Sequence, residues 1–189
     1  MAQKLSFNYV EQLKALLDIF PHDTFEEIGK ALIYAYENEK HVFIMGNGGS
    51  GSTASHFACD INKGSCFALE KKFKVICLND NVPTILAYAN DLSYSKVFVE
   101  QLKNFLQQGD VVIGISGSGN SENVLQAISY AKGKGARTIG WTGFDGGKLA
   151  QIVDIPLVAA GNDMQKVEDI HMIVVHMLMQ YFCSALQTE

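Results

Sequence analysis

Five short runs rich in apolar and β-branched residues alternate with segments of helical spacing, and this alternation is what most constrains the fold. The runs cover residues 41–45, 74–78, 110–116, 137–142 and 154–158. Helical spacing is found over residues 93–106, 121–132 and 164–185. Strands that alternate with helices form a parallel sheet whose two faces are both covered. The sequence therefore predicts an α/β fold with a doubly wound, five-stranded parallel sheet.

Two helices are expected before the first strand. Apolar residues recur on one helical face up to Phe20, and Thr24 begins a capping box, Thr-x-x-Glu, for a second helix. The length suits a single domain over residues 1–189. We expect residues 1–40 to form a helical pair for oligomer packing and residues 41–189 to form the α/β core.

Composition indicates a soluble chain without a nucleic-acid surface. Apolar residues make up 48% of the chain, charged residues make up 19%, and the net charge is −5. No apolar run approaches the roughly 20 residues that cross a bilayer, and the first residues lack the apolar core of a signal peptide. Lys and Arg form no block, and the four cysteines include no Cys-x-x-Cys pair. We predict a cytoplasmic protein that binds neither membrane nor nucleic acid.

A glycine-rich loop follows the first predicted strand, with the sequence Gly-Asn-Gly-Gly-Ser-Gly at residues 46–51. Glycine lets a backbone approach a phosphate closely, and the free amides at a helix start attract the anion. The spacing also fits the Gly-x-Gly-x-x-Gly of dinucleotide-binding proteins, with Asp80 as the acid after the second strand. No second domain remains for a hydride acceptor, so a nicotinamide-binding domain is the weaker alternative and no nucleotide cofactor is expected.

A serine-rich loop follows the third predicted strand and places Ser116, Ser118 and Ser121 before another helix. Hydroxyls and helix-start amides together donate several hydrogen bonds to a phosphate monoester. Ser121 alone would more simply cap its helix. Because parallel strands end at the same edge of the sheet, both loops face one region. The pair of loops predicts a phosphate site.

Two helices carry residues suited to acid–base chemistry. His56 and Asp60 lie one turn apart on the helix after the glycine loop, so both can face one cavity. On the last helix, Glu168 and His176 differ by about 80° around the axis, whereas His171 points about 140° from His176. The simpler alternatives are a hydrogen-bonded core histidine, an aspartate paired with a nearby lysine, and a solvated acid near a helix start.

Several motifs, in order and over nearly the whole chain, resemble the sugar isomerase (SIS) fold and, within it, the phosphoheptose isomerase branch. These motifs are Gly46-Asn-Gly-Gly-Ser50, His56-Phe-Ala58, Asn90-Asp91, Ile115-Ser116-x-Ser118-Gly-Asn-Ser121, Thr142-Gly-x-Asp-Gly-Gly147 and the helix with His171 and His176. The resemblance implies isomerisation of sedoheptulose 7-phosphate to a heptose 7-phosphate. It also implies a homotetramer with sites between subunits.

The same resemblance implies roles for individual residues. Asp60 and His176 would be catalytic, and zinc or another divalent metal would be held by His56, Asp60, Glu168 and His176. The substrate-binding residues would be Asn47, Gly48, Ser50, Asn90, Asp91, Ser116, Ser118, Ser121 and Glu168.

Two residues depart from the pattern of this branch. Asp60 stands where the resemblance leads us to expect a glutamate, and Glu168 stands where it leads us to expect a glutamine. The first change retracts a carboxylate by one methylene, and the second adds a negative charge. Because of these departures, an alternative interpretation remains: a non-catalytic SIS module that binds a sugar phosphate as a sensor or a partner-assembly protein.

Overall fold

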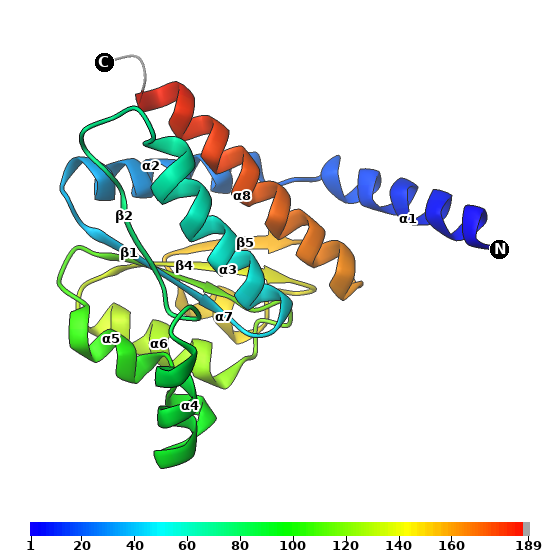
Figure 1. Cartoon of the computed structure of the whole chain (residues 1–189). Helices are drawn as coiled ribbons and strands as arrows, with labels where there is room; N and C mark the ends of the chain where they lie inside the picture. Colours follow the sequence, from blue (N-terminus) through cyan, green and yellow to red (C-terminus); the bar gives the residue numbers. More distant parts are fainter. Residues whose placement is uncertain (187–189) are drawn as a thin grey trace.

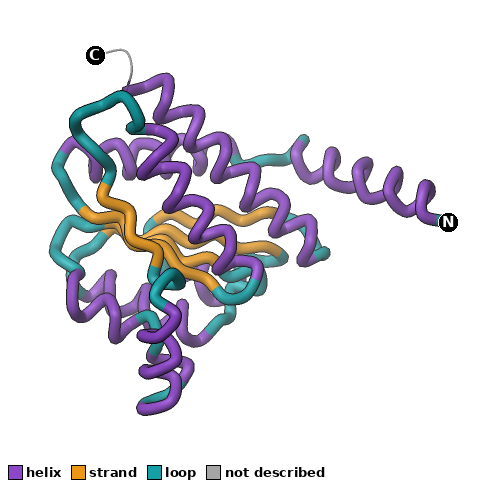
Figure 2. The backbone as a smooth tube through the Cα atoms, in the orientation of Figure 1, coloured by secondary structure: helices purple, strands orange, loops and turns teal. Residues whose placement is uncertain are grey.

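A five-stranded sheet lies between two layers of helices in the computed structural model, which describes residues 1–186 (Figures 1 and 2). The strands are β1 (His41–Gly46), β2 (Lys74–Cys77), β3 (Val111–Ile115), β4 (Arg137–Gly143) and β5 (Ile155–Ala159). Their order is β2-β1-β3-β4-β5, and every neighbouring pair is parallel. This confirms the predicted fold class, and each strand end lies within one residue of its expected position.

Each face of the sheet has its own layer of helices and its own apolar core. One layer consists of α2 (His22–Glu37), α3 (Gly49–Cys59) and α8 (Met164–Leu186). The other consists mainly of α5 (Val99–Phe105), α6 (Glu122–Gly133) and α7 (Gly147–Ile152). In the first core, the rings of Phe57 and Trp141 meet edge to face with centroids 5.9 Å apart. Trp141 is therefore a packing residue, as its place on a central strand predicts.

The strand order brings the glycine loop beside the serine loop. Gly46, the last residue of β1, is paired with Ile115, the last residue of β3. The chain leaves β1 toward one side of the sheet and β3 toward the other, so the gap between these strands is a topological switch point. Folds of this kind bind ligands at such a point, beyond the carboxyl ends of the strands.

The two N-terminal helices differ in their packing. Helix α2 buries four residues, whereas α1 (Ala2–Leu17) buries none and projects away from the sheet (Figure 1). Leu5 and Phe7 of α1 are 70% and 66% exposed. The arm is attached near its middle, where the Tyr9 hydroxyl donates a 2.5 Å hydrogen bond to Asp169 of α8.

Helix boundaries differ from the prediction in two places. Helix α2 begins at His22, directly after Pro21, so the expected capping box at Thr24 is wrong. Proline suits the first positions of a helix because it lacks an amide hydrogen that would go unpaired there.

The single helix expected over residues 93–106 is also wrong. The structure has α4 (Val82–Asp91), a 3₁₀ turn (Tyr94–Lys96) and the shorter α5. Asn81 begins α4, and its side-chain oxygen accepts a 3.2 Å hydrogen bond from the amide of Thr84. An asparagine followed by an early proline is a recognisable helix start that hydrophobic spacing alone does not detect.

Helix α8 is, by length and composition, the one helix among residues 1–186 that could cross a membrane. This is weak evidence, because the core helix of a soluble protein meets the same criteria. Eight side chains of α8 are buried in the protein, including His171 and Lys166. The apolar side chains among them pack against α3 and the sheet.

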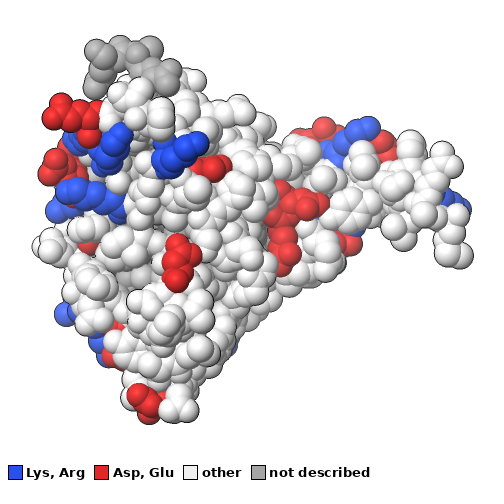
Figure 3. All heavy atoms as spheres, viewed as in Figure 1, with Lys and Arg blue, Asp and Glu red and all other residues white. Residues whose placement is uncertain are grey.

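Charged residues of both signs lie close together on the surface. Among the described residues on the face drawn in Figure 3, Lys and Arg side chains are interspersed with Asp and Glu and form no separate basic area. With a net charge of −5, this distribution gives no electrostatic footprint for nucleic acid on that face.

Candidate functional site

The glycine loop is held against the sheet by an asparagine side chain. Asn79 accepts a 3.1 Å hydrogen bond from the amide of Gly46 and donates a 2.7 Å bond to its carbonyl, so it prolongs the pairing at the end of β1. Gly48 has a positive φ of 55°. A Cβ added at Gly49 would lie 2.8 Å from the carboxylate oxygens of Glu168. The positive φ therefore favours glycine at position 48, and the Glu168 carboxylate occupies the space that a side chain at position 49 would need.

The serine loop is ordered by its own hydroxyls. The Ser116 and Ser121 hydroxyl oxygens are 2.9 Å apart, and the amide of Ser121 donates to the Ser116 oxygen at 3.4 Å. Ser121 is the residue that precedes α6, but its side chain makes no capping bond. Its hydroxyl therefore does not serve mainly as a helix cap.

Another glycine-rich loop, at residues 142–147, packs against the backbone of the serine loop. The amide of Gly143 donates to the carbonyl of Gly117 at 2.8 Å, and a Cβ at Gly119 would lie 2.1 Å from the carbonyl oxygen of Gly146. Gly119 also has a positive φ of 66°. The close backbone contact gives this loop a structural role.

A cavity of about 310 Å³ lies between the glycine and serine loops. Its size is at the lower end of the range for small-molecule sites. It is lined by Asn47, Gly48, Gly49, Ser50, Ile115, Ser116, Gly117, Ser118, Ser121, Met164 and Glu168. Seven of the residues expected to bind substrate thus border one cavity.

A larger cavity, of about 740 Å³, lies at the opposite edge of the sheet, beside α2. Its lining includes Lys132 and Asp154, which are paired with each other at 3.1 Å. No set of unpaired polar groups of one kind converges there. The smaller cavity is the better candidate site because four serines and the glycine loop line it together.

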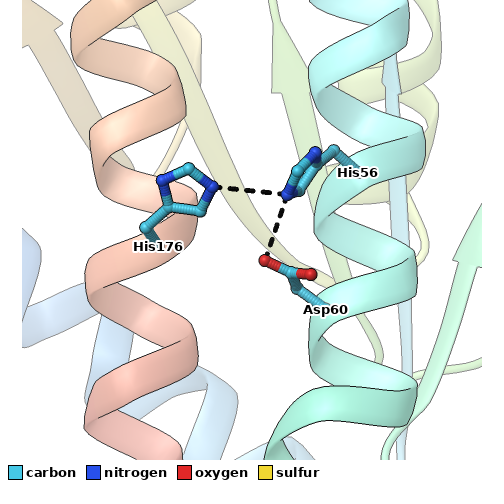
Figure 4. A group of neighbouring side chains, drawn as sticks. All are labelled: His56, Asp60 and His176. Carbon is cyan, nitrogen blue, oxygen red and sulfur yellow. Dashed lines mark hydrogen bonds and ion pairs between the residues drawn. The ribbon is translucent and has the colours of Figure 1, made fainter.

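The second part of the site is a cluster of His56, Asp60 and His176, which point toward one another between α3 and α8 (Figure 4). The Nε2 atom of His56 lies 3.2 Å from an Asp60 carboxylate oxygen and 3.3 Å from Nε2 of His176. If that His56 nitrogen donates its proton to Asp60, it has no lone pair left for His176. A cation bound among them would satisfy all three atoms at once.

The spacing of the cluster suits a metal ion. Zinc bonds of 2.0–2.2 Å in a tetrahedral arrangement separate neighbouring ligand atoms by about 3.4 Å. The two measured separations, 3.2 and 3.3 Å, are close to that value. The ligand atoms of all three residues lie within 4.8 Å of one another. Glu168, expected as a fourth ligand, lies at the cavity and is not part of this cluster.

Asp60 is the first residue of a π-helix, Asp60–Ser65, which continues α3. Asn62 fastens this segment to the edge strand β2, because its side chain accepts from the amide of Val75 at 3.0 Å and donates to its carbonyl at 2.9 Å. Short π-helical segments occur frequently at functional sites. No pattern in the sequence predicts this π-helix.

Asn90 and Asp91 lie apart from both the cavity and the cluster. They end α4, are exposed, and bond to each other through Nδ2 of Asn90 and a carboxylate oxygen of Asp91 at 2.8 Å. Neither lines the cavity between the loops. Within the described residues of one chain, the structure does not bring this pair to the other candidate residues.

His171 faces the core, as its angular distance from His176 predicts. Its Nε2 lies 3.1 Å from the carbonyl oxygen of Thr142, and Nδ1 has no hydrogen-bond partner among the described residues. Burial lowers the pKa of His171 to about 4, although the bond to Thr142 acts in the opposite direction. His171 is therefore a neutral core residue.

Sequence reasoning missed two partners of the cavity residues. Asn47 lines the cavity, but its side chain is hydrogen-bonded to Asn123 and Tyr94. Both partners lie on segments whose place beside the glycine loop depends on the three-dimensional fold. No motif in the sequence marks them.

Comparison with known proteins places the chain in a family. The family model described as SIS domain matches residues 8–143. Phosphoheptose isomerase of Helicobacter pylori strain P12 is 35% identical over 179 residues, which cover 94% of this chain and 92% of the relative. Phosphoheptose isomerase of Clostridium acetobutylicum is 36% identical over 182 residues, which cover 96% of this chain and 84% of the relative.

Solved structures show the same relationship. A phosphoheptose isomerase from Francisella tularensis is 27% identical, with a TM-score of 0.86 and coverage of 96% of both chains. The phosphoheptose isomerase of Neisseria gonorrhoeae, at 24% identity, shares the fold with a TM-score of 0.89 and covers 97% of this chain and 100% of its own. The chain therefore belongs to the SIS domain family and, within it, to the phosphoheptose isomerases.

Proposed function

We propose that this protein is an isomerase that interconverts sedoheptulose 7-phosphate and a heptose 7-phosphate in the cytoplasm. One observation supports the proposal most: helices α3 and α8 each extend from the phosphate cavity to the cluster of His56, Asp60 and His176. Helix α3 begins at the glycine loop and leads to Asp60, while α8 carries Glu168 at the cavity and His176 at the cluster. Glu168 and His176 are about 12 Å apart along the helix axis, so an extended sugar phosphate can reach both parts.

The reaction moves one hydrogen between adjacent carbons and one between their oxygens, and it adds or removes no atom. A base takes the proton from the hydroxyl-bearing carbon beside the carbonyl, and an acid protonates the carbonyl oxygen. The resulting enediol then takes a proton at the other carbon and loses one from the other oxygen. In our proposal, Asp60 takes and returns the carbon-bound proton and His176 serves the two oxygens.

The phosphate would be bound by the hydroxyls of Ser50, Ser116, Ser118 and Ser121 and by the backbone at Gly48. Ser50 and Ser116 are 6% and 3% exposed. Hydroxyl and amide donors in such a sheltered site bind a charged phosphate more strongly than in open solvent. Glu168 would contact the sugar between the phosphate and the reacting carbons.

We also propose that His56, Asp60 and His176 hold zinc or another divalent cation. When bound, the cation would polarise the sugar oxygens as a Lewis acid. The donor set and its 3.2–3.3 Å spacing support this assignment. Asp60 offers one carboxylate oxygen to the cluster, which leaves the other for the sugar.

A homotetramer is the proposed assembly. The exposed apolar side chains of the α1 arm, such as Leu5 and Phe7, need a partner surface. Asn90 and Asp91 would contact substrate in a site completed by a neighbouring subunit, which would account for their distance from the cavity within one chain.

Turnover by metal-replete protein tests the proposal. The metal content of freshly purified protein is measured first, and sedoheptulose 7-phosphate is then offered to the wild type, Asp60→Asn and the control Asp18→Asn. We expect wild-type turnover, a kcat lower by about 10²–10⁴ in Asp60→Asn because the general base is lost, and no change in the control.

The competing candidate is a non-catalytic sugar-phosphate sensor, which the shorter carboxylate at Asp60 favours. Wild-type protein that binds sugar phosphates and a stable protein partner, but turns over no ketose or aldose phosphate, would establish the sensor. Activity that rises in Asp60→Glu would instead show an enzyme limited by the reach of its carboxylate.

A further inference from the structure

We propose that Asn123 and Tyr94 are positioning residues that, through Asn47, fix the distance between the two loops of the phosphate cavity. Asn47 would then act as part of a clamp between the loops. The inference deepens the proposed function and rests on its assignment of the cavity to a phosphate group.

The clamp is a reciprocal pair of amides. Nδ2 of Asn47 donates to Oδ1 of Asn123 at 2.9 Å, and Nδ2 of Asn123 donates to Oδ1 of Asn47 at 2.8 Å. Asn47 follows β1 directly, and Asn123 lies in the first turn of α6, two residues after Ser121. The pair therefore joins the glycine loop to the end of the serine loop.

The orientation of the buried amide is fixed by the backbone. Asn123 is 2% exposed, and its Oδ1 also accepts a 3.0 Å hydrogen bond from the amide of Val124. A flip of this amide would place hydrogen atoms against that donor and against Asn47. In a sheltered site each of these bonds is stronger than in water, so the pair adopts one arrangement.

Tyr94 supplies the third contact. Its hydroxyl donates to Oδ1 of Asn47 at 2.8 Å, from the 3₁₀ turn between α4 and α5. The Asn47 oxygen thus accepts two hydrogen bonds, and one of its two amide hydrogens is used by Asn123. With most of its capacity used within the protein, this side chain is suited to holding a loop in place.

The sheet alone does not fix the two loops. Pairing between β1 and β3 ends at Gly46 and Ile115, and the residues that line the cavity follow these positions. Asn79 holds Gly46 from one side, and the amide pair holds Asn47 from the other. Loss of the pair would let the loops separate and weaken phosphate binding. The distant cluster of His56, Asp60 and His176 would keep its geometry.

Binding of inorganic phosphate tests the inference without requiring turnover. Its Kd is measured by titration calorimetry for the wild type, Asn123→Ala, Asn123→Asp, Tyr94→Phe and the control Asn104→Ala. Asn104 is exposed on α5, and its amide makes one long bond, 3.5 Å, to a carbonyl of its own helix. Its replacement should leave the Kd unchanged.

The expected loss of phosphate affinity increases with the number of hydrogen bonds to Asn47 that a variant removes. Asn123→Ala removes both bonds to Asn47, and we expect the phosphate Kd to rise about tenfold or more. Asn123→Asp keeps the acceptor and loses the donor, and Tyr94→Phe removes one hydroxyl, so each should raise the Kd about threefold. Tyr94 is 55% exposed, so its variant tests the clamp even if Asn123→Ala fails to fold.

Two further readouts separate positioning from general destabilisation. In a double-mutant cycle, Asn47→Ala and Asn123→Ala should be far from additive in phosphate affinity, since each breaks the same pair. In Asn123→Asp and Tyr94→Phe, metal affinity at the histidine cluster and kcat should stay within twofold of the wild type while KM rises with the phosphate Kd.

The outcomes distinguish this inference from the proposed function. Weaker phosphate binding in the variants supports the clamp even if no protein in the series isomerises a sugar. Folded Tyr94→Phe and Asn123→Asp proteins with a wild-type phosphate Kd would overturn the clamp, even if the wild type is an active isomerase. Wild-type protein that does not bind phosphate at the cavity would overturn it too.

Discussion

The cavity between the loops and the histidine–aspartate cluster belong to one candidate site, yet they are held in opposite ways. The cavity is built from loop backbone and hydroxyls that are already hydrogen-bonded within the protein, such as Ser116 with Ser121 at 2.9 Å. The cluster is built from helix side chains that bond only to each other in the described residues, and the side chain of His56 is 44% exposed.

This difference suits the cavity to binding the phosphate and the cluster to the chemistry of the proposed reaction. A pre-organised cavity needs little rearrangement to bind a phosphate, because its donors are already in place. The cluster has three ligand atoms that one shared proton cannot satisfy, so a bound cation or a substrate group would complete it in our proposal. The two parts should therefore fail independently when mutated.

The largest effect is expected at the cluster. His176→Ala removes one of three metal ligands and the proposed acid, so we expect weaker metal binding and a kcat lower by about 10²–10⁴. The phosphate Kd should not change. Gln180→Ala, exposed one turn further along α8, is the matched control for metal analysis and kinetics. Equal losses of phosphate and metal affinity in His176→Ala would show that the cavity and the cluster do not act independently.

The two histidines of α8 should differ in their effect on stability. The folded-state pKa of His171 is about 4, below the usual value of 6.5, because the ring is buried. As the pH falls from about 6.5 toward 4, the unfolded chain takes up a proton that the folded protein does not, so stability falls by up to about 3 kcal/mol.

Urea unfolding between pH 4 and 7.5 measures this loss. His171→Gln should lose this contribution to the pH dependence, whereas His176→Gln should keep it, since His176 is exposed. An unchanged pH profile in His171→Gln would show that other groups cause the acid loss of stability.

A smaller loss, confined to binding, is expected at the cavity. Ser116→Ala removes a hydroxyl that faces the proposed phosphate, and a hydrogen bond to a charged group contributes about 1.5–3 kcal/mol. KM and the phosphate Kd should rise about tenfold or more with kcat unchanged. Ser129→Ala, exposed on α6 away from the cavity, serves as the control. A fall in kcat with constant KM would place Ser116 in the chemistry instead.

The smallest effect is expected at the α1 arm, which belongs to neither part. Tyr9→Phe removes the hydroxyl that bonds to Asp169 and should lower the free energy of unfolding by less than about 1 kcal/mol, because the contact is only partly buried. Hydrogen exchange should become faster in α1 and stay constant in α2, which is packed on the sheet. Slow exchange retained throughout α1 would show that other contacts hold the arm.

Local patterns were sufficient for the strands and for much of the site. Apolar runs located all five strands, and the spacing of His56 and Asp60 placed both residues on one helix face. These features depend on residues close together in the sequence, whose geometry a helix or strand imposes directly. The same reasoning separated His171 from His176 on α8.

Two helix starts are marked in the sequence by signals weaker than hydrophobic spacing, and the prediction missed both. Asn81 and the proline after it mark the start of α4, and Pro21 marks the start of α2. The π-helix at Asp60 has no such marker, because it depends on Asn62 reaching the edge strand β2.

The sequence by itself determined the layered α/β fold, the two polar loops and the residue types available for phosphate, proton and metal chemistry. Only the tertiary structure decided which of these residues meet. It joined His176 to His56, left Glu168 at the cavity, and turned Asn47 toward Asn123 and Tyr94. The physical reason is that a side chain's partners across 40–120 residues are set by strand order and helix packing, which no local pattern records.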